Sequence, residues 1–511
     1  MIIIAAATLS TTAPADNKST ATLHADKGQN VISPEIYGQF AEHLGSCIYG
    51  GLWVGEDSPI PNINGYRKDV FEALKALEVP VLRWPGGCFA DDYHWMDGIG
   101  PRNQRPSLRN NNWGGTIEDN SFGTHEFLNL CEMLGCEPYI SGNVGSGTVK
   151  EMAQWVEYMT SDGDTPMARL RRQNGRDKAW KVKYFGIGNE AWGCGGNMTP
   201  EYYSNEYRKF NTYLRDQSGN RLYRIASGAN DYNYNWTRTL MQNIGKRMNG
   251  ISLHYYTVKS WHNKGKATAF SPEEYYLTLE KCLDIDPVIQ RHCAIMDSLD
   301  RDKKIALMVD EWGTWWDEEP GTIAGHLYQQ NSLRDAMVAS LMLNVFHKYT
   351  DRVRMCNIAQ VVNVLQSMIL TDQEGEGHIV LTPTYHVFEM YRPFQGATFL
   401  PITINTDSIA TIEGKNVPLL SASAARAKDG SIVLALANTS LSDAQTVDLQ
   451  VEGYKAKTVS GRILTSNDAK DYNSFDHPSV VSPKTFSDAK LKKGRLTVKL
   501  PAKAIVVLRL N

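Results

Sequence analysis

The sequence predicts an α/β fold, a (β/α)8 TIM barrel with a C-terminal β-sandwich domain. Three observations support this prediction. The chain has 511 residues, more than one ordinary domain holds, so two domains or a barrel with an accessory module are expected. Eight strand candidates, most of them separated by helical segments, lie between residue 36 and about residue 360. After about residue 395, short strands separated by turn signals replace that pattern.

The predicted barrel strands are short apolar runs, several of them rich in β-branched and aromatic residues. In chain order they cover residues 36–40, 79–83, 137–141, 182–188, 224–227, 250–254, 305–310 and 353–358. Apolar residues at helical spacing predict helices between these strands, over residues 69–77, 124–134, 149–159 and 332–348. A further helix is expected to start at Thr199-Pro200, where a capping hydroxyl precedes a proline at the first helical position. A long helical region with an insertion runs to about residue 300.

The C-terminal region has the pattern of an all-β sandwich. Residues 431–437, 446–451, 495–500 and 504–510 form short β runs, and several of these alternate polar and apolar residues. Residues 19–24 alternate in the same way and are expected to add a strand to the sandwich, which brings both termini together. The predicted units are an N-terminal strand region (19–30), the catalytic barrel (31–392) and a jelly-roll-like sandwich (393–511).

Charge and composition narrow the class of partner. Lys and Arg total 53 and Asp and Glu total 56, and this balance argues against nucleic acid as the main partner. The 12 Trp and 24 Tyr suit a carbohydrate partner, because aromatic faces pack against the C–H faces of sugars; a large core explains them equally well. The eight Cys show no paired CxxC spacing, so zinc and thioredoxin-like sites are weakly supported.

The N-terminal residues 1–18 are first apolar and small, then rich in Ser, Thr and Ala. They resemble a secretory signal that lacks its basic leader, and a frayed tail is the alternative. A signal remnant predicts a secreted or periplasmic protein, and without one the expected location is cytoplasmic. No other run approaches the ~18 apolar residues of a membrane span, so none is expected.

Two of the predicted strands deliver a carboxylate at their C-terminal ends beside a tryptophan. The fourth strand leads to Asn189 and Glu190, and the seventh leads to Glu311. Barrel enzymes of this type collect their chemistry at the C-terminal ends of the strands. Two carboxyls that face one substrate are the machinery of glycoside hydrolysis, because one donates a proton to the leaving oxygen and the other meets the positive charge at the anomeric carbon. A gap of roughly 5 Å between them means retention, and more than ~6.5 Å means inversion.

Further polar and aromatic residues fall just beyond the predicted strand ends. They are Glu42, Arg83, Cys88, His254, Tyr256, Trp315 and Gln360. Each has a structural alternative: Glu42 and Arg83 could form a buried ion pair, and His254 could be a satisfied core histidine. Chance can explain one such residue at a strand end, but it does not explain all of them. The set therefore predicts one site. Tyr256 and His254 are expected to orient the nucleophile and tune the pKa values of the two carboxyls.

Several long motifs resemble the α-L-arabinofuranosidases of glycoside hydrolase family 51. They are IYGQFAEHLG (36–45), LRWPGGCFAD (82–91), YFGIGNEAW (184–192) and NIAQVVN (357–363), with GRILT (461–465) and NSF (473–475) in the C-terminal region. The resemblance covers about residues 20 to 511. The chain departs from the shorter bacterial intracellular pattern at its N-terminus and in Gly193-Cys-Gly-Gly196 after the Glu190 motif.

The resemblance implies a retaining mechanism, with Glu190 as general acid/base and Glu311 as nucleophile. It implies an arabinofuranosyl pocket touched by side chains from five strand ends, with a tryptophan wall for which Trp113 and Trp315 are the candidates. The pocket residues are Glu42, Arg83, Cys88, Asn189, Tyr256 and Gln360. It also implies a homo-oligomer, often a hexamer in related enzymes. No metal or organic cofactor is implied, because hydrolysis by two carboxylates needs neither.

The expected activity is the release of terminal non-reducing α-L-arabinofuranosyl residues from arabinan, arabinoxylan or arabino-oligosaccharides. The close alternative is a β-xylosidase or an endo-β-glucanase on the same barrel, because terminal β-xylopyranose and α-arabinofuranose present similar hydroxyls. A pocket favours an exo enzyme and a cleft favours internal cleavage, and loop shape decides between them. A non-catalytic sugar-binding protein is the alternative from another class, and it is expected to lose one of the two carboxylates.

Overall fold

The computed structural model describes residues 17–372 and 377–511. The signal-like segment predicted over residues 1–18 therefore falls outside the described residues, except for its last two positions. Within the described residues, no helix combines the length and the apolar character needed to cross a membrane.

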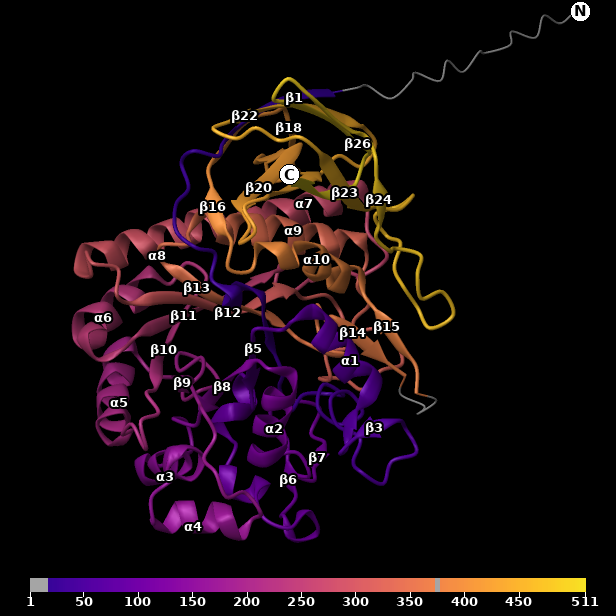
Figure 1. The fold of residues 1–511 in the computed structure, drawn as a ribbon. Coiled ribbons are helices and arrows are strands. Elements are labelled where there is room, and N and C mark those ends of the chain that lie inside the picture. Colours follow the sequence, from indigo (N-terminus) through magenta and orange to yellow (C-terminus); the bar gives the residue numbers. More distant parts are fainter. Residues whose placement is uncertain (1–16, 373–376) are drawn as a thin grey trace, which may run out of the picture.

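Eight parallel strands close into a barrel, which confirms the predicted fold class (Figure 1). Going round the barrel from the first strand, the order is β2, β5, β8, β9, β10, β11, β12 and β13, which is also their order along the chain. Their bounds are β2 (Gly38–Phe40), β5 (Val81–Trp84), β8 (Glu137–Gly142), β9 (Tyr184–Ile187), β10 (Tyr223–Asn230), β11 (Gly250–Thr257), β12 (Ala306–Thr314) and β13 (Val353–Ala359). Because every neighbouring pair is parallel, all eight C-terminal ends meet at one end of the barrel.

Helices follow most barrel strands and pack around them. They are α1 (Lys68–Leu77), α2 (Thr124–Leu134), α3 (Val149–Thr160), α4 (Pro166–Gln173), α5 (Pro200–Tyr213), α6 (Tyr234–Ile244), α7 (Pro272–Leu283), α8 (Ile285–Leu299), α9 (Leu333–Lys348) and α10 (Pro383–Tyr391). The predicted start at Thr199 is correct: its hydroxyl accepts a hydrogen bond from the backbone N–H of Tyr202, and Pro200 takes the first helical position. α9 is buried along nearly its whole length, because it lies between the barrel and the sandwich.

The structure differs from the predicted strand bounds at two places that matter for the site. The first two residues of the predicted first strand (36–40) belong to the 3-10 helix η1 (Pro34–Tyr37), since Pro34 favours the start of a helical turn, and the other three form β2. β11 and β12 run three and four residues beyond their predicted ends. His254, Tyr256 and Glu311 therefore lie within strands, where backbone pairing fixes their side chains, and not in loops.

The C-terminal domain is built from two sheets of mostly antiparallel strands. One sheet has the order β17, β1, β22, β26, β25, and the other has the order β16, β20, β21, β27, β23, β24. Their bounds are β1 (Asn17–His24), β16 (Thr398–Leu400), β17 (Ile402–Asn405), β20 (Leu420–Arg426), β21 (Ile432–Asn438), β22 (Gln445–Glu452), β23 (Val459–Leu464), β24 (Lys484–Phe486), β25 (Ala489–Lys492), β26 (Arg495–Leu500) and β27 (Ala504–Leu510). The inward side chains, such as Leu434, Leu449 and Leu508, are fully buried and form a separate apolar core.

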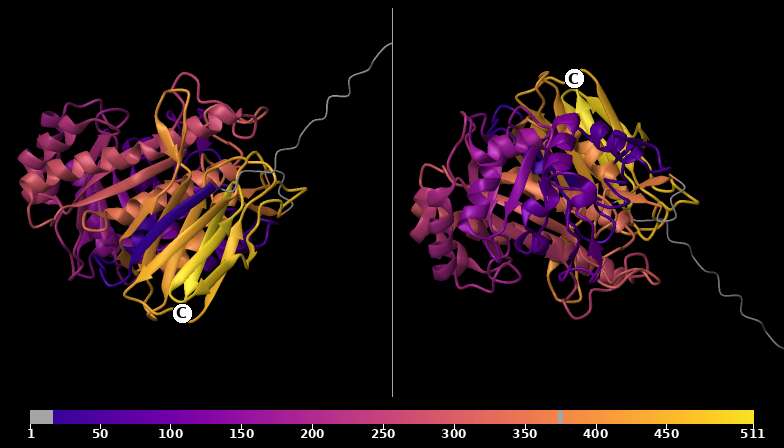
Figure 2. Two further views of the ribbon diagram at one scale, coloured as in Figure 1. Left: turned by 90° about the horizontal axis from the view of Figure 1, so that it is seen from above. Right: turned by 90° about the horizontal axis from the view of Figure 1, so that it is seen from below.

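The N-terminal strand β1 belongs to this sandwich although it is the first element of the chain. It pairs in parallel with β22 and antiparallel with β17. Figure 2 shows β1, in indigo, among the orange and yellow strands of the domain. Four two-stranded hairpins complete the chain: β3 (Asn62–Ile63) with β4 (Tyr66–Arg67), β6 (Leu108–Arg109) with β7 (Ile117–Glu118), β14 (Ile369–Thr371) with β15 (Ile379–Leu381), and β18 (Ser408–Ala410) with β19 (Asn416–Pro418).

The sandwich packs on α9 and α10, on the side of the barrel wall (Figure 1). Polar contacts join the two units: the His347 ring lies 2.8 Å from the hydroxyl of Ser423, and Arg462 donates to Glu389 at 2.6 Å. The sandwich also touches the start of α9, where the N–H of Leu333 donates to the carbonyl of Asp471. α9 follows β12 in the chain, so the sandwich supports the barrel beside one of the two predicted catalytic strands.

Candidate active site

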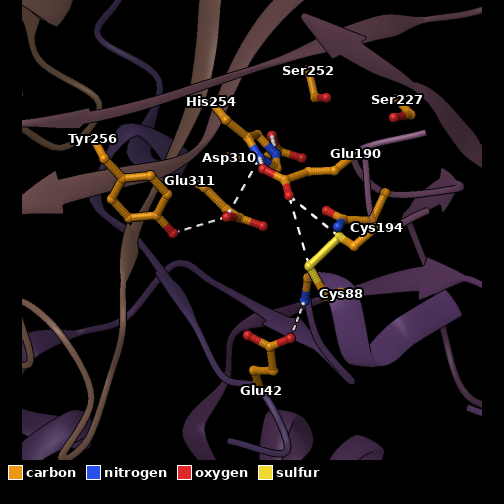
Figure 3. A network of polar contacts seen from close by, with 12 residues as sticks. Glu42, Cys88, Glu190, Cys194, Ser227, Ser252, His254, Tyr256, Asp310 and Glu311 are labelled. Carbon is orange, nitrogen blue, oxygen red and sulfur yellow. Dashed lines mark hydrogen bonds and ion pairs between the residues drawn. A yellow bond between two sulfur atoms is a disulfide. The ribbon is translucent and has the colours of Figure 1, made fainter. Parts of the chain in front are cut away.

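The predicted site residues meet at the C-terminal end of the barrel, where Figure 3 shows most of the acidic ones. Eight of the eleven line one cavity of about 40 Å³. They are Glu42, Cys88, Trp113, Glu190, Tyr256, Glu311, Trp315 and Gln360. The remaining three, Arg83, Asn189 and His254, are buried directly behind this lining and hydrogen-bond to it or to one another. The cavity brings both predicted catalytic glutamates, Glu42 and two tryptophans together in one small site.

Glu311 is held on both of its oxygens near the end of β12. Arg83 donates to Oε1 at 2.9 Å, and the Tyr256 hydroxyl donates to Oε2 at 2.9 Å (Figure 3 shows the latter). Burial raises the pKa of Glu311; the positive charges of His254 and Arg83 oppose the rise without cancelling it, and Glu190 adds to it. The result is a carboxylate with a fixed position and orientation.

His254, on β11, lies between three carboxylates. Its Nδ1 is 2.8 Å from Glu190 and 3.4 Å from Glu311, and its Nε2 is 3.2 Å from Asp310. Burial lowers the pKa of His254, but attraction to Glu311 and the hydrogen bonds to Asp310 and Glu190 outweigh burial and raise the pKa to about 10. At neutral pH the ring is therefore an imidazolium, which donates from Nδ1 to Glu190 and forms an ion pair with Asp310 at Nε2. His254 is thus buried and has partners, as the alternative of a satisfied core histidine expected, but those partners are the carboxylates of the site.

Glu190 follows β9 on a turn that leaves its carboxyl partly exposed to the cavity. The residue adopts a left-handed backbone conformation, with φ of 37°, an uncommon state for a residue with a side chain. Its Oε1 is bonded to His254. Its Oε2 faces two sulfur atoms, that of Cys194 at 3.4 Å and that of Cys88 at 3.8 Å. Only one oxygen of Glu190 is therefore tied to a hydrogen-bond donor.

Cys88 and Cys194 form a disulfide that crosses the mouth of the site (Figure 3). Cys88 was predicted as a pocket residue, but its bond to Cys194 was not predicted, because the two lie 106 residues apart. The bond ties the loop after β5 to the loop that carries Glu190. The other six cysteines are free and buried.

Glu42 is the centre of a second network on the opposite side of the cavity. Its Oε1 accepts hydrogen bonds from the backbone N–H groups of Gly87 and Phe89 and from the indole of Trp113, all within 3.1 Å. Its Oε2 accepts from the amide of Gln360 at 3.0 Å. Burial, with a smaller contribution from the nearby Glu311, raises the pKa of Glu42 to about 7. Its bond to Glu42 thus fixes Trp113, one of the two predicted wall residues, as part of the cavity lining.

Among the predicted site residues, two buried side-chain atoms lack a hydrogen-bond partner within residues 17–372 and 377–511. They are Nδ2 of Asn189, whose Oδ1 accepts from Arg83 at 2.6 Å, and Oε1 of Gln360. A buried donor or acceptor without a partner is destabilising unless a ligand or a water completes it. One free donor and one free acceptor suit the hydroxyl groups of a sugar.

Asp91 positions the Asn189 end of the site, and the sequence reasoning did not single it out. Its carboxylate accepts from the N–H groups of Val144, Gly145 and Asn189. Burial raises its pKa to about 7, although these three hydrogen bonds lower it. Its place at the end of the LRWPGGCFAD motif was the available signal, but the motif alone did not show that it supports the loop after β9.

The two glutamates are close enough for direct cooperation on one bond. One carboxylate oxygen of Glu190, one of Glu311 and a ring nitrogen of His254 all lie within 4.8 Å of one another. In the described part of the chain this trio and Cys88–Glu190–Cys194 are the two clusters with metal-ligand spacing. The imidazolium is protonated at both nitrogens, and both sulfurs are in a disulfide, so neither cluster presents a full set of free ligands. The arrangement suits proton transfer and nucleophilic attack at one carbon.

Comparisons with known proteins agree with this site. Residues 73–272 match a family model described as the α-L-arabinofuranosidase 1 domain, and residues 310–504 match one described as the α-L-arabinofuranosidase C-terminal domain. The chain is 64% identical to a Bacteroides ovatus protein named as an intracellular exo-α-L-arabinofuranosidase, over 97% of this chain and 96% of that protein.

Solved structures give the same result. The GH51 arabinofuranosidase from Xanthomonas axonopodis pv. citri is 48% identical and superposes with a TM-score of 0.95, covering 97% of this chain and all of that one. The α-L-arabinofuranosidase from Thermotoga maritima, solved as an arabinose complex, is 31% identical with a TM-score of 0.82, covering 96% of this chain and 99% of that one.

Proposed function

This chain belongs to the α-L-arabinofuranosidases of glycoside hydrolase family 51, and from that premise we propose that it releases terminal non-reducing α-L-arabinofuranosyl residues by double displacement. The observation that carries the proposal is the short separation of the two carboxylates, with oxygens of Glu190 and Glu311 within 4.8 Å. Retaining glycosidases place their carboxyl groups about 5–5.5 Å apart, whereas inverting enzymes leave ~6.5–9.5 Å for a water. The spacing here supports direct attack on the sugar by the carboxylate of Glu311, without a water molecule between them.

In the proposed first step, Glu311 attacks the anomeric carbon while Glu190 donates its proton to the departing glycosidic oxygen. The C–O bond to the leaving group breaks and an ester bond to Glu311 forms. In the second step, Glu190 takes a proton from water, and the hydroxide displaces Glu311 and restores both carboxyls. Arg83 and Tyr256 hold Glu311 in line for the attack, through their bonds to its two oxygens.

The proposed arabinofuranose pocket uses the free polar atoms around the cavity. Asn189 Nδ2 donates to one hydroxyl and Gln360 Oε1 accepts from another, since both are buried and otherwise unpaired among the described residues. Glu42, held by Trp113 and two backbone N–H groups, accepts from a further hydroxyl. Trp113 and Trp315 form the apolar walls.

The shape of the pocket also helps to choose between the proposed activity and its alternatives, an endo-β-glucanase and a β-xylosidase. The small cavity between Trp113 and Trp315 favours binding of one terminal ring, and this disfavours an endo-β-glucanase, which needs an open cleft. A β-xylosidase has an equally closed pocket and stays the close alternative. Arabinan, arabinoxylan and arabino-oligosaccharides are all proposed substrates, because each carries terminal α-L-arabinofuranosyl units.

The test is a comparison of initial rates on p-nitrophenyl α-L-arabinofuranoside, p-nitrophenyl β-D-xylopyranoside and a soluble β-glucan, with the first product anomer followed by NMR. We expect strong release from the arabinofuranoside, with α-L-arabinofuranose formed first. A dominant xyloside or glucan rate would overturn the substrate, and first formation of the β anomer would overturn double displacement while leaving the arabinofuranosidase activity in place.

The proposed location is intracellular. The Bacteroides ovatus relative carries that word in its name, which supports the cytoplasmic expectation over the secreted or periplasmic one based on residues 1–18. Fractionation of the native host with marker enzymes for each compartment tests this, and activity in the culture medium or periplasmic extract would overturn it.

The chain is also proposed to form a homo-oligomer, a hexamer by resemblance to related enzymes. Light scattering coupled to gel filtration measures this directly. A mass near the 57.2 kDa of one chain would overturn the proposal.

A further inference from the structure

We propose that Trp261 and Lys264 form a second sugar-binding subsite at the mouth of the pocket, which holds the sugar ring to which the terminal arabinofuranose is attached. This inference rests on the proposed function. The two residues lie in the loop between β11 and α7, which carried no signal in the sequence analysis.

Trp261 is unusual among the tryptophans of the chain. All 12 lie in the described ranges, and Trp261 is 50% exposed, whereas each of the others is buried or partly buried. Tryptophan is rarely left in water, because its large apolar surface is favourable to bury. An exposed ring beside a site therefore indicates a surface that a ligand covers.

The ring of Trp261 adjoins the cavity directly. Its centroid lies 5.5 Å from that of Trp315 and 6.5 Å from that of Tyr256, both in near-perpendicular orientation. Trp315 and Tyr256 line the cavity that contains the two glutamates. A sugar that packs on Trp261 is thus next to the ring in the pocket, as the two units of one glycosidic bond must be.

The loop that carries Trp261 is fixed at both ends. The Lys259 ammonium donates to Glu274 at 2.8 Å, and the carbonyl of Gly265 accepts from the N–H of Asp317, two residues after Trp315. Arg334 donates to the carbonyls of the two residues that follow Gly265. The ring is therefore held in place before a ligand binds, which lowers the entropy lost on binding.

Lys264 adds the polar part of the subsite. Its ammonium lies 5.6 Å from the centroid of the Trp315 ring, at the same mouth of the cavity. An ammonium has three donors and no acceptor, so it can bind ring hydroxyls of a neutral sugar. An aromatic face for the C–H side of a ring and a donor for its hydroxyls together form the recognition chemistry of a sugar.

The experiment compares a substrate that reaches this subsite with one that does not, and it uses the wild-type ratio of their rates as the reference for each variant. Arabinobiose fills the pocket and the second position, whereas α-L-arabinofuranosyl fluoride fills the pocket alone. For Trp261→Ala we expect the ratio of kcat/KM for arabinobiose to kcat/KM for the fluoride to fall about 5- to 10-fold, mainly through KM. Trp261→Phe should recover part of the ratio, and Lys264→Ala should lower it less than Trp261→Ala.

Tyr213→Ala is the matched control, because Tyr213 is 56% exposed at the far end of α5, away from the C-terminal ends of the strands. It should leave the ratio as in the wild type. If Trp261→Ala slows both substrates equally, the ring only packs on Trp315, and the subsite proposal is overturned while the arabinofuranosidase stands. If the wild-type enzyme hydrolyses neither compound, the proposed function fails, and the subsite falls with it.

Discussion

The end of β12 and the loop after β9 each supply one carboxylate, but they hold it in opposite ways. Glu311 lies within a strand, its side chain is 7% exposed, and both of its oxygens accept hydrogen bonds. Glu190 lies in a turn, its side chain is 18% exposed, and one of its oxygens faces only the sulfurs of a disulfide. The strand and its hydrogen bonds thus fix the side chain of Glu311, whereas the turn leaves the side chain of Glu190 freer to move.

This difference matches the two roles that a retaining mechanism requires. A nucleophile must keep one position and orientation throughout, and the bonds from Arg83 and Tyr256 provide this for Glu311. A proton donor must exchange its proton with the leaving group and then with water, which an oxygen open to the cavity allows. The backbone environment therefore supports the assignment of Glu311 as nucleophile and Glu190 as acid/base, in addition to the sequence motifs.

The largest expected effect is that of Glu311→Ala. We expect kcat/KM to fall at least about 10⁴-fold on every arabinofuranoside, whatever its leaving group, because no covalent intermediate can form. Added azide should attack in place of the carboxylate and give an arabinofuranosyl azide of inverted configuration. Residual activity above a few per cent, with an unchanged circular dichroism spectrum, would contradict the role of this residue.

Glu190→Ala should have a smaller effect that depends on the leaving group. On arabino-oligosaccharides we expect a loss of about 10²- to 10⁴-fold, because the alkoxide leaving group needs a proton. On a 2,4-dinitrophenyl arabinofuranoside the first step needs no acid, so the enzyme should accumulate as the covalent intermediate. Azide should then restore turnover and give a product of retained configuration, the opposite of the result for Glu311→Ala. The same azide product from both variants would remove the distinction between the two regions.

His254 couples the two regions, and its removal tests that coupling through pH. The pKa of His254 is raised from 6.5 to about 10, so the folded protein keeps a proton that the unfolded chain loses above pH 6.5. The stabilisation it gives is fully present below about pH 6.5 and is lost as the pH rises towards 10.

For His254→Gln we expect an unfolding free energy about 3 kcal/mol lower than that of the wild type at pH 6, with the gap closing towards pH 10. Urea denaturation at a series of pH values measures both curves, and a gap that stays constant from pH 6 to 10 would argue that the ring is neutral. We expect the variant to remain more active than either glutamate variant, because both carboxyls stay in place.

The fold could be predicted from sequence because its signals are local. Apolar runs placed the eight barrel strands in their correct order, and helical spacing placed α2 with its observed bounds, Thr124–Leu134. The same count predicted Glu190 and Glu311 just after the fourth and seventh strands, whereas the structure has Glu311 within the seventh. The strand pattern failed at residues 36–37, where a 3-10 turn replaces the start of the first strand, and at β11 and β12, which run past their expected ends.

Other parts of the site depend on contacts between distant segments, which a single sequence does not show. The charge of His254 follows from three carboxylates, on β12 and on the loop after β9, that surround it only after folding. The Cys88–Cys194 bond joins loops 106 residues apart. Trp261 lies in the loop after β11, beyond the positions just past the predicted strand end at residue 254 that the search covered, so it was missed. Asp91 was visible as part of a motif, but its three backbone partners come from two other loops.

Of these variants, Cys194→Ser should have the smallest effect on catalysis. It should still affect the loop that carries Glu190 and leave Glu311 in place. The disulfide ties the loop with Glu190 to the loop after β5, whereas nothing comparable holds Glu311, which its strand already fixes. We expect the unfolding free energy to fall by about 2–4 kcal/mol, because the bond closes a long loop in the unfolded chain. kcat/KM should fall only a few-fold, through greater freedom of Glu190. Dithiothreitol should destabilise the wild type by the same amount and leave Cys194→Ser unaffected, which serves as the internal control.

Thiol titration of protein purified from the native host adds a test of location, because a reducing cytosol keeps both sulfurs as thiols and an oxidising compartment keeps them bonded. If reduction leaves the unfolding free energy of the wild type unchanged, the disulfide does not restrain the loop that carries Glu190. The turn alone then determines how far that residue can move.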